Sequence, residues 1–323
     1  MYSVVIPLFN KAIYVEESIK SVLNQSFKEF ELIIVNDGSI DNSLDIVTGL
    51  VSTLLPPLGG WKVIDQINQG VSIARNNGVK VSKCDYIAFL DADDWWEPTY
   101  LEEMVKLIEE YPNAGIYGSN YYLIKNGNKR VAPIGIDSAF NKGTINYFKE
   151  YAKTGCMPLW TGATVIKKTI FVSEKGFKPN LKLGEDFDLW IRVALKYPVA
   201  YLNKPLANYN QDVELINRAI GDKLYEPHEH MLFTDYGDLM NNIDFRNLYE
   251  VLAVYGLLPY YLAEKNKREV DSILSGIHWK NHSFKYWLYY KIIPILILKI
   301  WMKFLILGSK LKQLLLSKII INH

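Results

Sequence analysis

Two groups of carboxylates are spaced in a way that could support chemistry. Asp91, Asp93 and Asp94 follow an apolar strand pattern, and Glu185 and Asp186 begin a helical pattern much later in the chain. Successive strand residues point to opposite sides, so Asp91 and Asp93 can face the same way. Their oxygens suit Mg²⁺ or Mn²⁺, which also take phosphate oxygens from a substrate. An acidic strand end that only caps the next helix is the alternative interpretation.

Two more polar residues lie where they could join such a site. Asp37 ends a neighbouring strand pattern, and Arg75 lies within a helical pattern. A buried Asp could accept the imide N–H of a pyrimidine base. An arginine could pair with a phosphate or with a site carboxylate, and a purely structural salt bridge is the alternative.

Alternating strand and helix patterns are predicted to position these residues. The predicted strands and helices are, in chain order, Ser3–Ile6, Ala12–Leu23, Phe30–Val35, Asn42–Leu54, Trp61–Ile67, Val71–Val81 and Tyr86–Leu90. This alternation predicts βαβ units with right-handed crossovers and an α/β fold with a mostly parallel sheet. Ligands of such sheets bind beyond the carboxyl ends of the strands, where polar and turn-forming residues gather in this sequence.

The patterns downstream are less regular. They predict a helix from Pro98 to Tyr111, a strand over Asn113–Leu123, a hairpin turn at Asn126–Asn128, a helix over Gly143–Tyr151, a strand over Thr161–Ile166, a mobile loop over Ser173–Gly184 and a helix over Glu185–Lys196. Residues 204–242 have no clear pattern, and a helical pattern runs from Phe245 to the end. We therefore predict a catalytic domain over 1–210, a flap or linker over 211–242 and a helical region over 243–323.

Short segments of the chain resemble the family 2 glycosyltransferases, in the order and at the spacing of that family. They are Val4–Asn10, Val35–Asp41, Asn68–Gly78, Phe89–Trp95 and Gly184–Trp190. Each segment alone is a weak signal, but their common order over residues 2–210 is specific. The resemblance implies a GT-A fold, a nucleotide-sugar donor, for which the family favours a UDP-sugar, and transfer with inversion.

The resemblance also implies a division of the donor site among matching residues. The residues expected at the nucleotide are Pro7, Phe9, Asn10, Asp37, Arg75 and Asp91. Among them, Arg75 would buttress the pocket and Asp91 would hold the ribose. Asp93 would bind Mn²⁺ or Mg²⁺ on the diphosphate, and His228 could complete the metal site from a flap.

On the acceptor side, Asp186 matches the position of the catalytic base, and Glu185 would orient it or touch the acceptor. An acceptor hydroxyl is a poor nucleophile at neutral pH, so a carboxylate must take its proton during attack. A divalent cation can stabilise the charge that develops on the departing diphosphate. The residues expected to meet the acceptor are Trp160, Thr161, Gly162 and Trp190. The loop before Gly184 could close over bound donor.

Composition predicts where the protein works. The net charge is +1, which favours no nucleic-acid partner. Two cysteines, Cys84 and Cys156, form no CxxC motif and indicate a reducing compartment, and the N-terminus has no signal-peptide pattern. From Ser272 onward there are eight lysines and no Asp or Glu. We therefore expect an acidic body with a basic tail.

The tail is predicted to be an amphipathic helix after Pro294, with peripheral membrane contact through residues 295–320. At helical spacing, the lysines that fall near one side are Lys299, Lys303, Lys310 and Lys318. This predicts a location at the cytoplasmic face of a membrane and fits a polyprenyl-linked or cell-surface glycan acceptor. A helix that packs on the body or on a second subunit is the alternative.

Two other functions remain open from the sequence. A nucleotidyltransferase also uses paired aspartates, but it should carry a Gly-rich basic loop after its first strand, and Pro7–Lys11 is not one. A non-catalytic, membrane-bound glycan-binding module would have lost Asp93 or Asp186, and both are present. The Gln-x-x-Arg-Trp signature of processive members is missing from the sequence, which predicts addition of a single sugar or a few.

Overall fold

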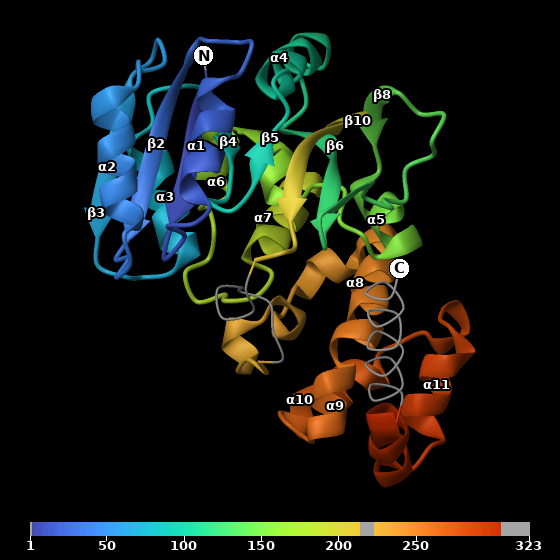
Figure 1. The fold of residues 1–323 in the computed structure, drawn as a ribbon. Helices are drawn as coiled ribbons and strands as arrows, with labels where there is room; N and C mark the ends of the chain where they lie inside the picture. Colours follow the sequence, from blue (N-terminus) through green and yellow to red (C-terminus); the bar gives the residue numbers. More distant parts are fainter. Residues whose placement is uncertain (1, 214–222, 305–323) are drawn as a thin grey trace, which may run out of the picture. The chain divides into compact units, whose positions relative to one another are not determined.

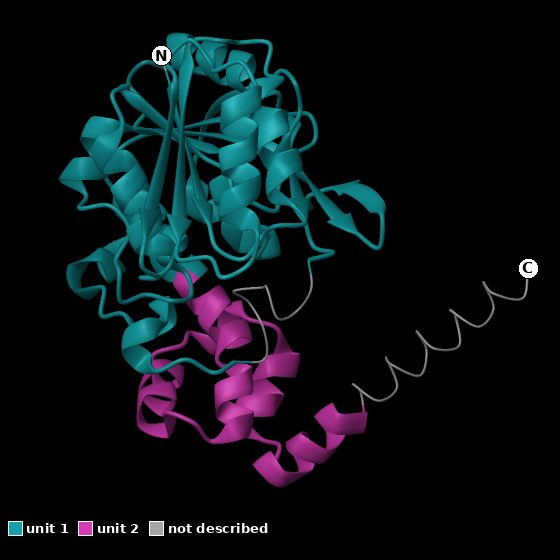
Figure 2. Ribbon diagram, turned by 60° about the vertical axis from the view of Figure 1, so that its left-hand side comes forward, with its two compact units in different colours: residues 1–248 teal, residues 249–323 magenta. Residues whose placement is uncertain are grey.

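A computed structural model describes residues 2–213 and 223–304 of the chain. The chain forms two compact units, residues 1–248 (unit 1) and 249–323 (unit 2), which are coloured separately in Figure 2. Unit 1 contains the sheet and all the carboxylates singled out above, and unit 2 is helical where it is described.

Unit 1 is built on a ten-stranded mixed sheet with helices on both faces (Figure 1). The strands are β1 (Tyr2–Leu8), β2 (Phe30–Asp37), β3 (Trp61–Gln66), β4 (Tyr86–Phe89), β5 (Trp95–Trp96), β6 (Ile116–Lys125), β7 (Asn128–Val131), β8 (Lys142–Ile145), β9 (Thr164–Lys167) and β10 (Val199–Asn210). The main order is β3-β2-β1-β4-β9-β6-β10-β5, with β7 on β6 and β8 on β10. The first four strands are parallel, as predicted, whereas β9 runs antiparallel between β4 and β6.

The helices of unit 1 connect and cover these strands. They are α1 (Val15–Leu23), α2 (Ser43–Thr53), α3 (Val71–Val81), α4 (Tyr100–Glu110), α5 (Tyr147–Thr154), α6 (Lys168–Ser173) and α7 (Glu185–Ala194). Every residue of β1 and β2 is buried, as expected for parallel strands covered on both faces. Helix α3 packs so closely that a Cβ added at Gly78 would lie 2.4 Å from Cγ1 of Val5.

The predicted end of strand β1 is too early. Strand β1 was expected to end before Pro7, but it continues to Leu8. Its pairing with β4 stops at Val5, whereas its pairing with β2 includes Pro7 opposite Val35. Pro7 therefore lies where only one neighbour continues the ladder, a position that tolerates the missing N–H.

Tertiary pairing explains the other differences from the predicted elements. The segment Gly143–Tyr151 was expected to be one helix, but Lys142–Ile145 pairs with β10 and the helix begins only at Tyr147. The side chain of Asn146 accepts a hydrogen bond from the Lys149 N–H and so caps that helix. The strand expected from Thr161 begins at Thr164, after a single 3₁₀ turn.

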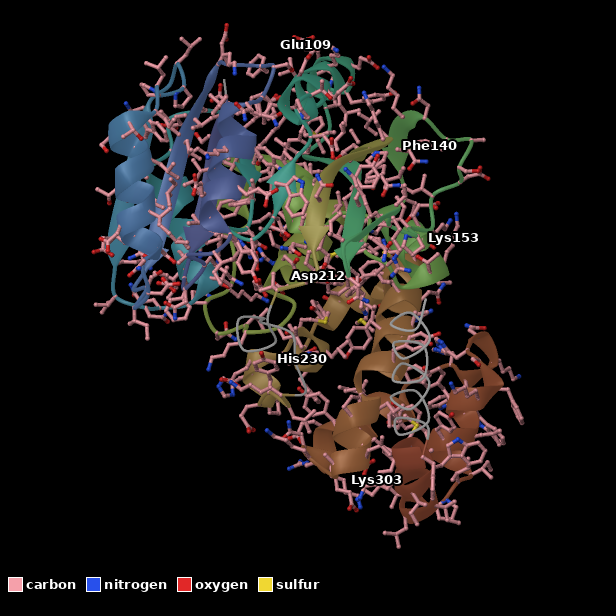
Figure 3. All side chains as sticks on the ribbon, viewed as in Figure 1. Glu109, Phe140, Lys153, Asp212, His230 and Lys303 are labelled. Atoms are coloured by element: carbon pink, nitrogen blue, oxygen red, sulfur yellow. The ribbon has the colours of Figure 1, made fainter. Side chains whose placement is uncertain are left out.

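The hairpin turn after β6 is confirmed. Asn126 and Gly127 have φ of 51° and 70°, the left-handed geometry that a two-residue hairpin turn requires. The Asp212 side chain, labelled in Figure 3, accepts hydrogen bonds from both of their backbone N–H groups. Strand β10 and its following loop therefore help to hold a turn that comes much earlier in the chain.

Unit 2 and the end of unit 1 consist of helices, as predicted. They are α8 (Ile243–Gly256), which crosses the unit boundary, α9 (Leu258–Ala263), α10 (Lys267–Ser275) and α11 (Phe284–Lys291), followed by a helical segment over 295–304. Within unit 2, the buried Glu250 carboxylate accepts hydrogen bonds from rings of His278 (2.6 Å) and His282 (3.0 Å). No helix among the described residues is both long and apolar enough to cross a membrane.

The segment 295–304 carries part of the predicted basic helix. Large apolar side chains of this segment are exposed, namely Leu296, Ile297, Ile300, Trp301 and Phe304. Lys299, one of the lysines predicted near one side of this helix, forms a 2.7 Å ion pair with Glu264 of unit 2. Lys310 and Lys318 lie outside the described residues.

Candidate active site

One buried arginine joins the two carboxylate groups that the sequence singled out. Arg75 projects from α3 and donates to Oδ1 of Asp91 (2.7 Å) and to Oε1 of Glu185 (2.9 Å). Its guanidinium lies 5.3 Å from the centre of the Phe177 ring, and only 4% of the residue is exposed. Burial lowers the pKa of Arg75, but Asp91 and Glu185 outweigh it and raise the pKa well above its usual value. Arg75 is therefore a permanent cation between the end of β4 and the start of α7.

The loop after β4 holds its three aspartates in different ways. Asp93 Oδ2 lies 2.6 Å from the Lys11 ammonium. Burial and the nearby Asp91 raise the pKa of Asp93, while Lys11 acts in the opposite direction. Asp94 is buried and accepts a hydrogen bond from the Asn210 N–H at the end of β10. Burial, Asp93 and Asp91 raise its pKa, which makes Asp94 a structural link rather than an exposed ligand.

The donor set around Asp93 fits a hard divalent cation. It offers carboxylate oxygens just after a strand. Burial and the nearby Asp91 carboxylate raise the pKa of Asp93, and a bound cation would offset the repulsion between the two carboxylates. Among the described residues, no group of three His, Cys, Asp or Glu side chains could hold a metal. Mn²⁺ or Mg²⁺ would therefore need substrate phosphate oxygens and water to complete its coordination. Mg²⁺ is usually bound in this way in proteins.

His228, which was predicted to complete the metal site, does not join Asp93 in such a group within the described part of the chain. His228 lies on an exposed 3₁₀ turn, Pro227–Glu229, and its carbonyl accepts a hydrogen bond from Asn180. His230, labelled in Figure 3, is buried, and its Nδ1 accepts the Leu232 N–H. Burial lowers the pKa of His230 to about 4, so its ring is neutral at physiological pH. Over residues 2–213 and 223–304, no three-ligand protein site contains His228.

The residues predicted at the nucleotide mostly brace the loops that follow the carboxyl ends of the strands. Buried Asp37 accepts from the Gln66 side chain (2.7 Å) and from the N–H groups of Gln69 (2.9 Å) and Gly70 (2.8 Å). It therefore shapes the loop between β3 and α3, where Gly70 has a φ of +93°. The remaining lone pairs of the carboxylate leave room for a further donor, and contact with a base stays a prediction.

The other predicted nucleotide residues lie in the loop after β1. Asn10 has a φ of 51°, its N–H donates to Ser39 Oγ (3.0 Å), and its Oδ1 accepts the Ile40 N–H (2.9 Å). It therefore ties this loop to the loop after β2. Phe9 is 44% exposed and can offer a ring face, whereas Pro7 is buried in β1. Their nucleotide contacts also stay predictions.

Asp186 is held by two neutral hydrogen-bond donors. Thr161 Oγ1 donates to Oδ2 (2.8 Å), and the Phe187 N–H donates to Oδ1 (2.7 Å). Thr161 is almost fully buried, on the turn before β9. It was predicted to meet the acceptor, but its hydroxyl instead orients the carboxylate. Burial and Asp186 raise the pKa of Glu185 to about 7, against the lowering effect of Arg75.

Three of the residues predicted to meet an acceptor are packing residues. Trp160 is 7% exposed, with ring centres of Tyr121 and Tyr209 at 5.0 and 5.1 Å. Trp190 is fully buried against Phe177. Neither tryptophan presents a ring face on which a sugar could stack in this structure, and their acceptor contacts stay predictions.

Gly162 is also a packing position. It is buried, and its carbonyl accepts the Trp96 ring N–H (2.6 Å). A Cβ at Gly162 would lie 2.4 Å from the Trp160 ring. This position therefore needs glycine because of the neighbouring indole, not because of a ligand.

The loop before α7 is anchored along the part predicted to be mobile. The Asn76 side chain donates to the Phe177 carbonyl (2.8 Å) and accepts the Phe177 N–H (3.0 Å). Arg192 donates to the carbonyls of Glu174 and Gly176, and Phe177 is fully buried. The prediction of a mobile loop is therefore wrong for residues 174–177. This anchoring also fixes the aromatic ring beside Arg75.

Sequence reasoning missed two contributors to this site. Lys11 lies next to the Pro7–Asn10 segment, but its role depends on a turn that brings it back to Asp93. The Thr161–Asp186 bond joins two segments that no local pattern connects. A polar hydroxyl just before an apolar strand was the only signal for it.

Comparison with known proteins places the chain in a family. The model of the family described as Glycosyl transferase family 2 matches residues 3–170. An uncharacterized glycosyltransferase of Rickettsia conorii is 32% identical over 206 residues, which cover 64% of this chain and 32% of that protein. The minor teichoic acid biosynthesis protein GgaA of Bacillus subtilis is 31% identical over 205 residues, which cover 61% of this chain and 44% of GgaA.

Solved structures show the same fold. The crystal structure of Staphylococcus aureus TarS (1–349) superposes with a TM-score of 0.61 at 18% identity and covers 87% of this chain and 82% of that chain. The same TarS region has been solved with UDP, at a TM-score of 0.55 and 20% identity over 90% of this chain and 75% of that chain. It has also been solved with UDP-GlcNAc, at a TM-score of 0.54 and 20% identity over 90% of this chain and 76% of that chain.

These findings agree with the predicted GT-A fold of unit 1. The chain spans about a third of the length of the Rickettsia relative that it matches. The family match covers β1 to β4 and continues through β9, and therefore includes Arg75, Asp91, Asp93 and Thr161. The chain belongs to glycosyl transferase family 2.

Proposed function

We propose that the chain is an inverting glycosyltransferase that moves one sugar from a nucleoside diphosphate sugar, with UDP as the nucleotide, to a hydroxyl of a glycan. The observation that carries this proposal is the Arg75 bridge. It joins Asp91, in the loop after β4, to Glu185, which precedes Asp186 in the chain. Two carboxylate groups with separate tasks are thereby held at one edge of a GT-A sheet. Family membership and the UDP and UDP-GlcNAc complexes of TarS support this donor class.

In the proposed mechanism, Asp186 is the general base. The Thr161 hydroxyl and the Phe187 N–H fix the plane of its carboxylate, and each oxygen retains a lone pair for the acceptor hydroxyl. As the acceptor oxygen attacks the anomeric carbon, its proton passes to Asp186 and the bond to the diphosphate breaks on the opposite side of that carbon. One such displacement inverts the anomeric configuration, and base catalysis of this kind contributes about 10²–10⁴-fold.

On the donor side, Asp91 would accept a ribose hydroxyl while Arg75 holds its other oxygen. Asp93, with Asp91 beside it, would hold Mn²⁺ or Mg²⁺ on the diphosphate. When bound, such a cation supplies charge neutralisation for the departing nucleoside diphosphate. The exposed ring of Phe9 would cover one face of the base, above the loops braced by Asp37 and Asn10.

The acceptor class follows from a proposed location at the cytoplasmic face of a membrane. The segment 295–304 leaves a group of large apolar side chains exposed, including Ile300, Trp301 and Phe304. Lysines dominate the charge of the chain from Ser272 onward. Apolar burial together with basic charge favours the interface of anionic lipid. A polyprenyl-linked glycan would meet the site there, and GgaA is named for biosynthesis of a cell-surface polymer.

A donor screen tests the proposed activity. Purified protein with Mn²⁺ is offered UDP-, GDP- and dTDP-sugars, and release of the nucleoside diphosphate is measured with and without glycan acceptors. We expect turnover with a UDP-sugar and loss of that turnover in Asp186→Asn. If no nucleotide sugar binds or turns over, the enzyme proposal is wrong.

Vesicle sedimentation tests the location. The full chain should sediment with phosphatidylglycerol vesicles more than with phosphatidylcholine vesicles. The double variant Trp301→Asp and Phe304→Asp should remain in the supernatant, whereas the matched change of exposed Ile243→Asp in unit 1 should not alter binding. Equal sedimentation of both variants would contradict the membrane proposal.

A further inference from the structure

Lys11 occupies one carboxylate oxygen of Asp93. Its ammonium lies 2.6 Å from Asp93 Oδ2, and the two side chains are 14% and 17% exposed. The pair is therefore well shielded, unlike a solvent-exposed ion pair. Lys11 lies at the carboxyl end of β1, and Asp93 lies in the loop after the adjacent strand β4.

The backbone delivers Lys11 to this position. Asn10 has the left-handed φ of 51° and is bonded through its N–H and its side chain to residues 39 and 40. The Lys11 N–H then donates to Ser43 Oγ at the start of α2 (2.8 Å). A non-glycine residue keeps such a backbone only where its surroundings over-determine it. These hydrogen bonds hold the loop after β1 in the conformation that places the Lys11 side chain against Asp93.

Each aspartate of the loop after β4 has its own partner. Asp91 pairs with Arg75, and buried Asp94 accepts a backbone N–H from β10. Asp93 pairs with Lys11, the cation that neutralises it in this structure. A divalent ion bound to Asp93 would share this carboxylate with the ammonium. Two like charges on one carboxylate repel strongly in a shielded site.

We propose that Lys11 competes with the divalent cation for Asp93 and keeps the affinity for free metal weak until the donor arrives. Diphosphate oxygens then supply the ligands that favour exchange of the ammonium for the metal. The inference rests on the metal role of Asp93 in the proposed function. Its consequence is ordered loading, because metal and nucleotide bind well together and the metal alone binds poorly.

Mn²⁺ binding without nucleotide tests this proposal. Free Mn²⁺ is measured by electron paramagnetic resonance during titration of the wild type and of Lys11→Met, Lys11→Gln and Lys11→Arg. We expect Lys11→Met and Lys11→Gln to bind Mn²⁺ about tenfold more tightly, because a neighbouring positive charge is removed. Lys11→Arg keeps the charge and should bind as weakly as the wild type.

The controls separate this inference from the proposed function. Lys20→Met removes an exposed lysine of α1 and should bind Mn²⁺ like the wild type. Asp93→Asn in the Lys11→Met background should abolish the tight site. Equal or weaker binding by folded Lys11→Met and Lys11→Gln would overturn the competition. Tight binding that persists without Asp93 would instead overturn the metal role assigned to Asp93.

Discussion

The carboxylates that we assign to the donor and to the acceptor differ in what holds them. Asp91 and Asp93 each face a protein cation, Arg75 or Lys11, at 2.7 and 2.6 Å. Asp186 is instead oriented by the Thr161 hydroxyl and a backbone N–H, which are neutral. A cation partner neutralises a carboxylate within the protein until a ligand takes its place. Neutral donors fix a base in place while opposing its protonation less than a cation would.

Glu185 lies between these two cases. It shares Arg75 with Asp91, yet burial and Asp186 raise its pKa to about 7. Glu185 can therefore gain or lose a proton near neutral pH. Asp91 and Asp93 differ from it because each is paired with a cation, Arg75 or Lys11. Substitutions of these carboxylates and of their hydrogen-bond partners should therefore have different effects on turnover and on stability.

The largest expected effect is that of Asp186→Asn on turnover. The amide keeps the shape of the side chain but cannot take the acceptor proton, so kcat should fall by about 10³-fold. Affinity for UDP should stay within about twofold, because we assign Asp186 to the acceptor and not to the nucleotide. Steady-state kinetics with the best donor of the screen would check this. Near-normal turnover would remove Asp186 from the chemistry.

Arg75→Met should have the next largest effect, on folding. It leaves Asp91 and Glu185 without their shared cation in a buried place, and breaking such a pair costs about 3–5 kcal/mol. Chemical denaturation of the purified variant measures the loss. Arg75→Lys keeps one charge but cannot reach both carboxylates in the same way, so its loss should be smaller. Equal stability of Arg75→Met and the wild type would refute the bridge.

Glu185 should make stability depend on pH. Its pKa is raised from 4.5 to about 7 in the folded state. Its contribution to stability is thus fully present below about pH 4.5 and is lost as pH rises through about 7. Relative to Glu185→Gln, the wild type should lose about 2 kcal/mol of unfolding free energy between pH 5 and pH 8. Urea unfolding at both pH values provides the measurement, and a constant difference would contradict the raised pKa.

The smallest expected effect is that of Thr161→Val. Loss of the orienting hydroxyl should lower kcat about tenfold, or about 1.4 kcal/mol, with little change in the KM for the donor. Thr161→Ser should restore most of the activity. Thr164→Val is a matched control, because that buried hydroxyl donates to the Trp160 carbonyl and not to Asp186. An equal loss in both valine variants would indicate a general packing defect.

Much of unit 1 could be predicted because its first strands are local features. Apolar runs that alternate with helical patterns gave β1 to β4 as a parallel sheet, and the polar segments after them marked its functional edge. Strand β10 could not be predicted in this way. Asn203, Lys204 and Pro205 interrupt its apolar pattern, and pairing with β6 tolerates them through register shifts around Pro205.

The site was predictable where chemistry depends on residue type and order, and less so where it depends on burial. Asp91, Arg75 and Glu185 were identified from the sequence, and the structure brings them together. The burial of Trp160 and Trp190 could not be predicted, because an aromatic residue near a site looks the same in sequence whether it is packed or exposed. The contact between Lys11 and Asp93 needs a left-handed turn at Asn10, which no sequence pattern specified.

The most direct test is calorimetric titration of UDP into the wild type, Asp93→Asn and Asp186→Asn, each with and without Mn²⁺. We predict Mn²⁺-dependent UDP binding by the wild type and by Asp186→Asn, and loss of that Mn²⁺ dependence in Asp93→Asn. Turnover should be lost in both variants. If Asp186→Asn abolished UDP binding, or if Asp93→Asn kept the full Mn²⁺ dependence, the division of donor and acceptor tasks between the two carboxylate groups would be wrong.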